Sequence, residues 1–120
     1  MDLTQLQREH QEWLAKNFPK QEPHQPLLGL AEEVGELSHA HLKAEQLIRE
    51  HTGGFAAEAY MTEAIDAVGD IVIYLASYCT AVGIDLDAAV ESTWNRVSAR
   101  DWTQDPITGG DWPLREEARR

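Results

Sequence analysis

The sequence predicts an all-α protein, a helical bundle of about four helices. Apolar residues recur at helical spacing along most of the 120-residue chain, and Pro or Gly clusters interrupt that spacing. No run rich in Val, Ile and Thr alternates with a period of two, so no strand is predicted. Helices joined by short breaks form bundles, and only two of these helices are long. We therefore expect a second copy of the chain to complete the bundle.

The first two helices flank a proline-rich connection. Residues 3–18 keep a loose helical spacing of apolar residues, and Pro19 ends that pattern. The segment KQEPHQP, residues 20–26, is typical of a loop, and Pro26 suits the first turn of a second helix that extends to about Glu50. One face of that second helix is predicted to carry Leu27, Leu30, Val34, Leu37 and His41.

The third and fourth helices follow the break HTGG, residues 51–54. The third is predicted from Phe55 to Val82, and its segment IVIYLA has apolar side chains at every angle around the axis, which predicts burial on all sides. Gly83 stands where a left-handed cap is expected. Asp85 can cap a fourth helix over residues 86–99, whose apolar stripe is Val90, Trp94 and Val97. The domain is predicted to span residues 1–102 and an irregular tail residues 103–120.

The composition excludes several classes of partner. The net charge is −11, with 10 Lys and Arg against 21 Asp and Glu, so a basic surface for a nucleic-acid polymer or an anionic membrane is not expected. The single cysteine, Cys79, permits no intramolecular disulfide and is expected to be a small buried residue. The first residues have no basic segment followed by an apolar one, and no stretch approaches 18 uncharged apolar residues. We expect a soluble, cytoplasmic protein.

Two predicted helices carry acidic stripes. In GLAEEVGELSHAH, residues 29–41, three glutamates fall within roughly 100° of arc at 3.6 residues per turn. Like charges at this spacing cost about 0.2–0.5 kcal/mol per pair unless a cation offsets them. The three are Glu32, Glu33 and Glu36. The third helix repeats the pattern within roughly 60° of arc. Its acids are Glu63, Asp66 and Asp70.

The two acidic stripes could simply be helix faces exposed to water, but the position of Asp70 argues against this. It directly precedes the apolar segment, where an uncompensated charge is expensive. Gly35 and Gly69 lie beside the acidic residues on their helices, and they have no side chains. We therefore expect the two helices to approach closely at this level. Carboxylate oxygens that converge from two helices suit Mg²⁺ or Mn²⁺ better than zinc. His39 and His41 point to different sides of their helix and are expected to be ordinary polar residues.

The motif EEVGE at 32–36, followed by an acidic pair ahead of GDIVIYLA at 69–76, resembles the MazG-like family of all-α nucleoside triphosphate pyrophosphohydrolases. The similarity covers residues 27–102. It implies a homodimer or homotetramer and Mg²⁺-dependent cleavage of a nucleoside triphosphate to the monophosphate and pyrophosphate, with Mn²⁺ as an alternative ion.

The resemblance also implies roles for individual residues. Glu33, Glu36 and Asp70 match the family's metal ligands, and Glu32 matches the leading glutamate and would orient or deprotonate the attacking water. The family pattern has a glutamate at the position of Ala67. That missing carboxylate is expected from one of two neighbours on the same face. They are Asp66 and Glu63.

The segment WNRVSARDW, residues 94–102, resembles the family's last helix, which contacts the nucleotide. Asn95 matches the family's asparagine. Glu91 and Ser98 stand where the family has lysine and arginine, so the phosphate contacts are expected from Arg96 or Arg100. Trp13, Trp102 and Trp112 are open candidates for a base pocket or a partner interface.

Two other functions remain open at this point. One is a non-catalytic helical adaptor whose acidic surface binds a basic partner. Ala67 supports this alternative, because a metal site that lacks a glutamate at this position could have lost its catalytic activity. The other is a di-iron carboxylate bundle, suggested by the Glu-x-x-His spacing of Glu36 and His39. Such a site needs a second Glu-x-x-His, which only a second copy could supply. The preferred base and sugar are not predicted.

Overall fold

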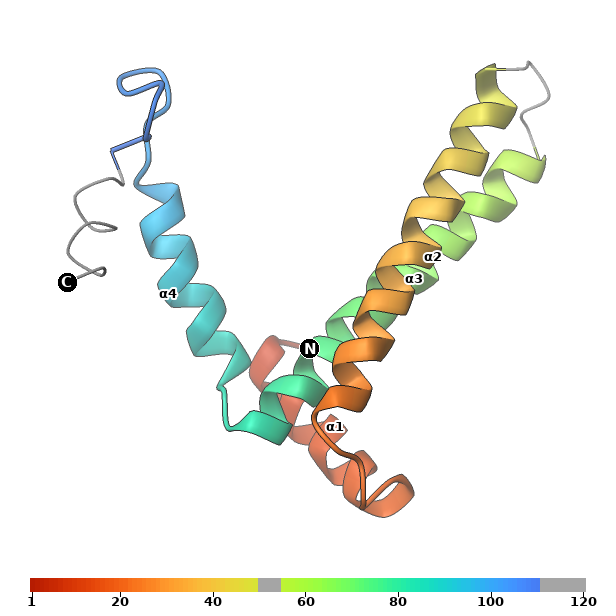
Figure 1. Cartoon of the computed structure of the whole chain (residues 1–120), viewed down its shortest axis with the longest axis vertical. Coiled ribbons are helices and arrows are strands. Elements are labelled where there is room, and N and C mark those ends of the chain that lie inside the picture. The colour runs from red at the N-terminus through yellow and green to blue at the C-terminus, as the bar shows by residue number, and fades with distance from the viewer. Residues whose placement is uncertain (50–54, 111–120) are drawn as a thin grey trace. The chain divides into compact units, whose positions relative to one another are not determined.

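The computed structural model describes residues 1–49 and 55–110, and these are helical apart from short connections and a final loop (Figure 1). The four helices are α1 (Leu3–Asn17), α2 (His24–Arg49), α3 (Phe55–Val82) and α4 (Leu86–Ser98). No strand occurs among these described residues. The prediction of an all-α class with four helices is confirmed.

The helix ends follow the local signals closely. α3 has the predicted bounds, and α2 begins two residues before Pro26. Gly83 adopts a φ of 79°, and the next residue, Ile84, donates its N–H to the carbonyl of Cys79 at 2.8 Å. This is the left-handed cap that the sequence predicts. Asp2 caps α1, since its carboxylate accepts from the N–H of Gln5 at 2.8 Å.

Contacts divide the chain into two compact units, Met1–Leu86 and a second that begins at Asp87. In the first unit α2 packs along α3, and α1 packs against α3 (Figure 1). The side chain of Gln7 fastens α1 to the turn after α3. Its Nε2 donates to the carbonyl of Ile84 at 2.8 Å, and its Oε1 accepts from the N–H of Leu86 at 2.9 Å.

The core of the first unit consists of small side chains. Six alanines are buried, with Cys79 and Leu86 beside them, and half-buried Leu3 and Leu6 pack against that end of the core. The alanines are Ala40, Ala44, Ala57, Ala64, Ala67 and Ala76. Small residues allow two helices to approach closely, so α2 and α3 meet along an alanine-lined contact.

The larger apolar side chains lie outside that contact, and this corrects one prediction. Leu27 and Val34, on the predicted apolar face of α2, are each 47% exposed, and His41 is exposed and lies 3.5 Å from Glu45. The segment 71–76 is not buried on all sides within one chain, because Ile73 is 40% exposed. Alanines fill the space between the helices, so the bulkier residues of these patterns lie at the edge of the contact or on the surface. The half-buried residues among them are Leu30, Leu37, Ile71, Val72, Tyr74 and Leu75.

Close helix contact was also expected at the wrong glycines. A Cβ at Gly35 or Gly69 would meet no atom within 4 Å, so neither glycine is required for close helix contact. The close approach occurs at Gly29, where a Cβ would lie 2.5 Å from Cε1 of Tyr74. Tyr74 comes from the apolar segment of α3 and therefore takes the space that Gly29 leaves on α2.

The helix segment Ala57–Val82 is long and apolar enough, at a mean hydropathy of 1.5, to cross a membrane by length and composition. A core helix of a soluble protein passes the same test. The segment carries Glu63, Asp66 and Asp70 on one side, a pattern that lipid does not favour.

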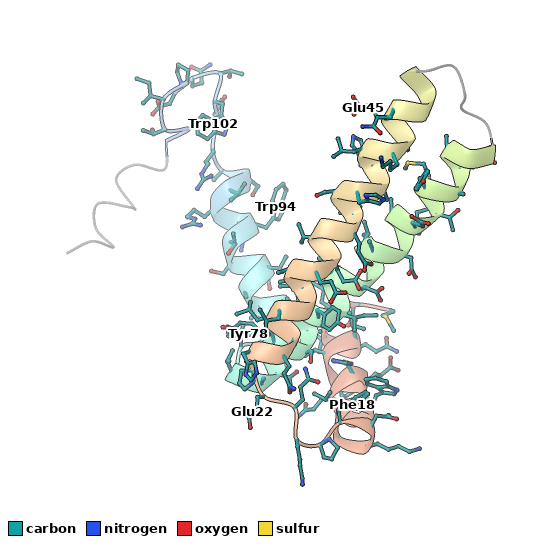
Figure 2. The ribbon with its side chains drawn as sticks, turned by 45° about the vertical axis from the view of Figure 1, so that its right-hand side comes forward. Phe18, Glu22, Glu45, Tyr78, Trp94 and Trp102 are labelled. Atoms are coloured by element: carbon teal, nitrogen blue, oxygen red, sulfur yellow. The ribbon has the colours of Figure 1, made fainter. Side chains whose placement is uncertain are left out.

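The second unit contains the rest of α4 and a loop over residues 99–110. Val90 and Trp94 of the predicted stripe are exposed, and Val97 is half-buried. In the loop, Asp101 accepts from the hydroxyl and the N–H of Thr103, while Asp105 accepts from the hydroxyl of Thr108 at 2.6 Å. Figure 2 shows Trp94 and Trp102 in this part of the chain. Residues 103–110, the part of the predicted tail that the structure describes, consist of turns and short irregular backbone.

Candidate functional site

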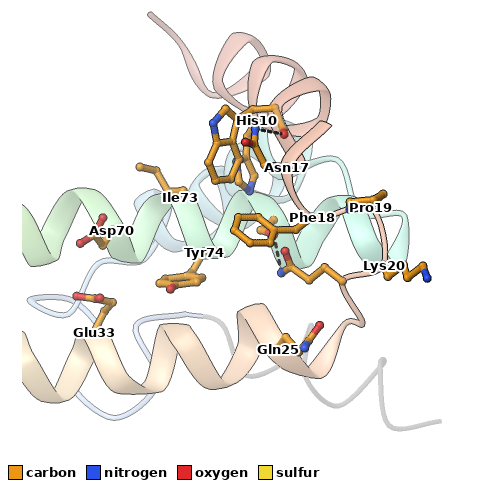
Figure 3. Close-up of a pocket in the computed structure, with 13 residues that line it drawn as sticks. His10, Asn17, Phe18, Pro19, Lys20, Gln25, Glu33, Asp70, Ile73 and Tyr74 are labelled. Atoms are coloured by element: carbon orange, nitrogen blue, oxygen red, sulfur yellow. Dashed lines mark hydrogen bonds between the residues drawn. The ribbon is translucent and has the colours of Figure 1, made fainter. Parts of the chain in front are cut away.

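A cavity of about 730 Å³ lies where the end of α1 and the α1–α2 connection face the middle of α2 and α3 (Figure 3). Its lining is acidic at one end and aromatic in the middle, with amide side chains and a single lysine near the connection. The lining residues are His10, Trp13, Asn17, Phe18, Pro19, Lys20, Gln21, Gln25, Glu33, Asp70, Ile73, Tyr74 and Ser77.

The acidic end is formed by two carboxylates on different helices. Glu33 of α2 and Asp70 of α3 lie opposite one another, on the two helices that border this end of the cavity (Figure 3). Both are half-buried, and Oε2 of Glu33 is buried without a hydrogen-bond partner in the described structure. A buried carboxylate oxygen with no partner is costly, so this position favours a cation or a proton.

The pKa of Glu33 is raised above the ordinary value of a glutamate. Partial burial of the carboxylate is the largest cause. Next come the negative charge of Glu36 and a hydrogen bond with it, followed by the charges of Asp70 and Glu32. Four carboxylates thus influence one another here, as the acidic stripes of the sequence suggest.

The aromatic part of the cavity comes from α1, the residue after it and α3. The rings of His10 and Trp13 stack with centroids 5.6 Å apart, and Trp13 and Phe18 lie 5.7 Å apart at a tilt of 57°. On the opposite side, the ring of Tyr74 lies over Gly29. A planar apolar ligand can stack between such rings.

Polar groups are also available within the cavity. Nε2 of His10 is buried without a partner in the described structure, and burial lowers the pKa of this imidazole. At neutral pH the ring is therefore uncharged and has a free nitrogen to hydrogen-bond with a ligand. Gln21 donates from Nε2 to Oγ of Ser77 at 3.3 Å. Lys20 is the one Lys or Arg among the described residues that line the cavity.

The remaining acidic residues line a second cavity of about 370 Å³. It is formed by Glu32, Gly35, Glu36, His39, Glu63 and Asp66. Both candidates for the missing ligand, Glu63 and Asp66, are thus on the side of Glu36, whereas Glu33 and Asp70 face the larger cavity. Because the charge of Glu36 acts on Glu33, the two acidic groups are adjacent.

The carboxylate oxygens at the acidic end of the cavity are ligands that magnesium prefers, but few of them lie close together. Among the described residues, no three His, Cys, Asp or Glu side chains are grouped closely enough to hold a metal ion by themselves. Mg²⁺ does not need such a cage, because proteins bind it through one or two carboxylates while water and substrate phosphates complete the octahedron. Glu33 and Asp70 form such a pair. Ala67, where the pattern expected from the sequence has a glutamate, is only 2% exposed.

The predicted nucleotide contacts belong to the second unit. Asn95 and Arg96 are exposed on α4, and Arg100 is half-buried just after it. Their role stays a prediction. Of the tryptophan candidates, Trp13 lines the larger cavity, Trp102 belongs to the second unit, and Trp112 lies outside the described residues.

Sequence reasoning missed most of the larger cavity. It did not select His10, Phe18, Gln21 or Ser77, which join the site through the packing of α1 and its connection on α3. The available signal was the aromatic cluster WLAKNF before a proline, which is unusual at the end of an otherwise polar helix.

Comparisons with family models, with curated proteins and with solved structures gave no match for this chain.

Proposed function

We propose that this protein is a Mg²⁺-dependent nucleoside triphosphate pyrophosphohydrolase. The observation that supports this most directly is the larger cavity, which has the facing carboxylates Glu33 and Asp70 at one end and the rings of Trp13, Phe18 and Tyr74 beyond them. A nucleotide has the same order of parts, with charged phosphates, a sugar and a flat base.

The spacing along α3 supports this orientation. At 1.5 Å per residue, Tyr74 lies roughly 6 Å and Ser77 roughly 10 Å beyond Asp70 along the helix axis. A nucleoside joins its base to its α-phosphate through a single sugar, so it can cover this span. The base would then stack among the rings while the triphosphate reaches the acidic end.

A cation is needed for this arrangement, because the acidic end would repel a triphosphate. Mg²⁺, or Mn²⁺ in its place, would be held in the larger cavity by the pair Glu33 and Asp70. The other ligands that the resemblance implies, Glu36 with Asp66 or Glu63, line the adjacent cavity and would have to turn toward the ion to join that pair. When bound, the ion supplies charge neutralisation for the phosphates and activation of water. The free oxygen of Glu33 and its raised pKa support a preference of this position for positive charge.

The protein groups then have distinct tasks in the proposed reaction. The water oxygen attacks the α-phosphorus, the bond to the bridging oxygen breaks, and pyrophosphate leaves. Glu32, exposed on α2 beside the other acids, accepts the proton of the water. The resemblance also assigns phosphate contacts to Asn95 and to Arg96 or Arg100, and these roles of residues in the second unit belong to the proposal.

The proposal includes a second copy of the chain, in a homodimer or homotetramer. Large apolar residues of α2 and α3 remain exposed, including Leu28 at 65% and Ile65 at 72%. An interior made mostly of alanine leaves too little buried apolar surface for two such long helices to be stable alone. Packing against another copy would cover these side chains.

One alternative function is a non-catalytic acidic adaptor. The buried Ala67 and the absence of a three-residue ligand group in the described chain favour it. A basic partner would then take the place of the cation beside Glu33 and Glu36. Such a protein would bind Mg²⁺ weakly and release no pyrophosphate.

The test is pyrophosphate release from a panel of nucleoside triphosphates, including dUTP and modified bases, with Mg²⁺, with Mn²⁺ and with chelator. Metal-dependent release is expected for the wild type. Glu36→Gln should abolish it while the helical content by circular dichroism is unchanged. Glu12→Gln, on exposed α1, is the matched control and should keep full activity. Full activity in Glu36→Gln, or no release with any nucleotide, would contradict the proposal.

A further inference from the structure

Ser77 is a buried polar residue in the most apolar part of α3. It follows the segment IVIYLA and is 2% exposed, yet the residue lines the larger cavity, and its Oγ accepts a hydrogen bond from Nε2 of Gln21 at 3.3 Å. A buried hydroxyl without a hydrogen-bond partner destabilises the folded protein, whereas an alanine at the same position would carry no such cost. The hydrogen bond from Gln21 offsets the cost of burying this hydroxyl group.

Gln21 is fixed from two directions. Its own N–H donates to the carbonyl of Phe18 at 3.2 Å, and its side chain reaches Ser77 on α3. After one N–H is used on Ser77, the amide retains one N–H donor and its carbonyl acceptor. The Watson–Crick edge of every base presents donors and acceptors side by side, and such an amide complements that arrangement.

We propose that Gln21, positioned by Ser77, reads the edge of the nucleobase and determines which base the enzyme prefers. This inference rests on the proposed pyrophosphohydrolase function. Ser77 lies seven residues beyond Asp70, roughly 10 Å along α3 at 1.5 Å per residue, which is the far end of the site as seen from the phosphates. The rings of Phe18 and Tyr74 between them stack on any base, so they do not discriminate among bases.

Hydrogen bonds to a base edge discriminate strongly. A site built to hydrogen-bond a substrate rejects an analogue that lacks the matching group, because the buried groups of the site are then left without partners. Gln21 is the base-contacting residue in this scheme, and Ser77 is a positioning residue that acts through it. Loss of either should therefore change the ranking of bases more than the rate with the best base.

The experiment compares dUTP, dCTP, dATP and dGTP with the wild type and with two variants, Gln21→Leu and Ser77→Ala. The ratio of kcat/KM between the best and the worst base should fall at least about tenfold in Gln21→Leu, which equals about 1.4 kcal/mol of lost discrimination. Ser77→Ala should reduce the ratio in the same direction. Gln11→Leu and Ser38→Ala, at exposed helical positions, should keep the wild-type ranking.

Nucleoside monophosphate binding provides a second readout that does not depend on turnover. Quenching of Trp13 fluorescence reports base binding, because Trp13 lines the same cavity. Base-dependent quenching that changes in Gln21→Leu supports the inference even if the wild type releases no pyrophosphate, in which case only the proposed reaction fails. An equal effect of Gln21→Leu on all four bases in both assays, or no base-dependent binding at all, would overturn it.

Discussion

Gly29 of α2 and Tyr74 of α3 form the tightest contact between those helices at a glycine. A Cβ on Gly29 would lie 2.5 Å from Cε1 and 2.6 Å from Cζ of Tyr74, distances that no real side chain tolerates. The absence of a side chain at 29 therefore sets the position of the Tyr74 ring, which is one wall of the larger cavity.

Gly29→Ala should displace that wall. Overpacking of this kind costs about 1–3 kcal/mol, and the shifted ring should raise KM for the nucleotide as well. Gly35→Ala, on the same helix with open space around it, is the matched control and should stabilise the protein by about 0.5–1 kcal/mol through helix propensity. Urea unfolding measures both effects, and an unchanged free energy of unfolding in Gly29→Ala would contradict the tight contact.

Glu33→Gln should raise the stability of the metal-free protein and abolish its activity. Because the pKa of Glu33 is raised in the folded protein, its ionisation opposes folding, and stability falls as pH increases through that pKa. In chelator at neutral pH the variant should therefore have a higher Tm than the wild type, and the difference should vanish below the ordinary pKa of glutamate. Activity should be lost. A lower Tm in chelator at neutral pH would show that Glu33 has a stabilising partner.

Trp13→Ala should weaken nucleotide binding without changing the chemistry. Stacking of a base on an aromatic side chain contributes about 1–3 kcal/mol, so KM should increase roughly 5-fold to 150-fold while kcat changes little. Trp13→Phe keeps a ring at this position and should recover most of the affinity. Steady-state kinetics on the best substrate measures both, and an unchanged KM in Trp13→Ala would place the base elsewhere.

Asp105 should make the loop of the second unit sensitive to acid. Hydrogen bonds from the hydroxyl and N–H of Thr108 lower the pKa of Asp105 below its ordinary value of 3.8. A lowered pKa stabilises the loop above the unfolded value, and this contribution is lost as pH falls through the folded value. The protection factor of the Thr108 amide, measured by NMR as the exchange rate relative to the intrinsic rate at the same pH, should fall in acid, and Thr108→Val should lower it already at neutral pH.

Ile65→Lys should yield a smaller assembly. Ile65 is 72% exposed on α3, so a lysine there costs nothing within one chain, but it would place a charge in an apolar contact with a second copy. Sedimentation should report a lower mass than for the wild type, together with a lower Tm. Val90→Lys, on exposed α4, provides a comparison with the other unit. A monomeric wild type would rule out the proposed assembly.

The fold was predictable because its signals are local. Proline, glycine and aspartate mark the helix ends, and the bounds of α3 and the cap at Gly83 follow from a few neighbouring residues. Which face of each helix is buried was not predictable in this way. Leu27 and Val34 match an amphipathic stripe as well as Ala40 and Ala44 do, and only the approach of α3 decides between them.

The acidic part of the candidate site was predictable and the rest was not. Periodicity places Glu33 and Asp70 on facing stripes, which the structure brings together at one cavity. The aromatic and amide residues come from α1 and its connection, and their meeting with Tyr74 and Ser77 depends on tertiary packing. A separation of 56 residues between Gln21 and Ser77 leaves no local pattern to detect.

The alanines between α2 and α3 have a further consequence for the chemistry. Ala40 and Ala67 are buried to within 1–2% exposure, so they hold the two helix axes at a fixed separation. That separation also limits how closely the side chains of Glu33 on α2 and Asp70 on α3 can approach one another. In the proposed metal site, these apolar side chains would act as a spacer that limits the size of the ion between the two carboxylates.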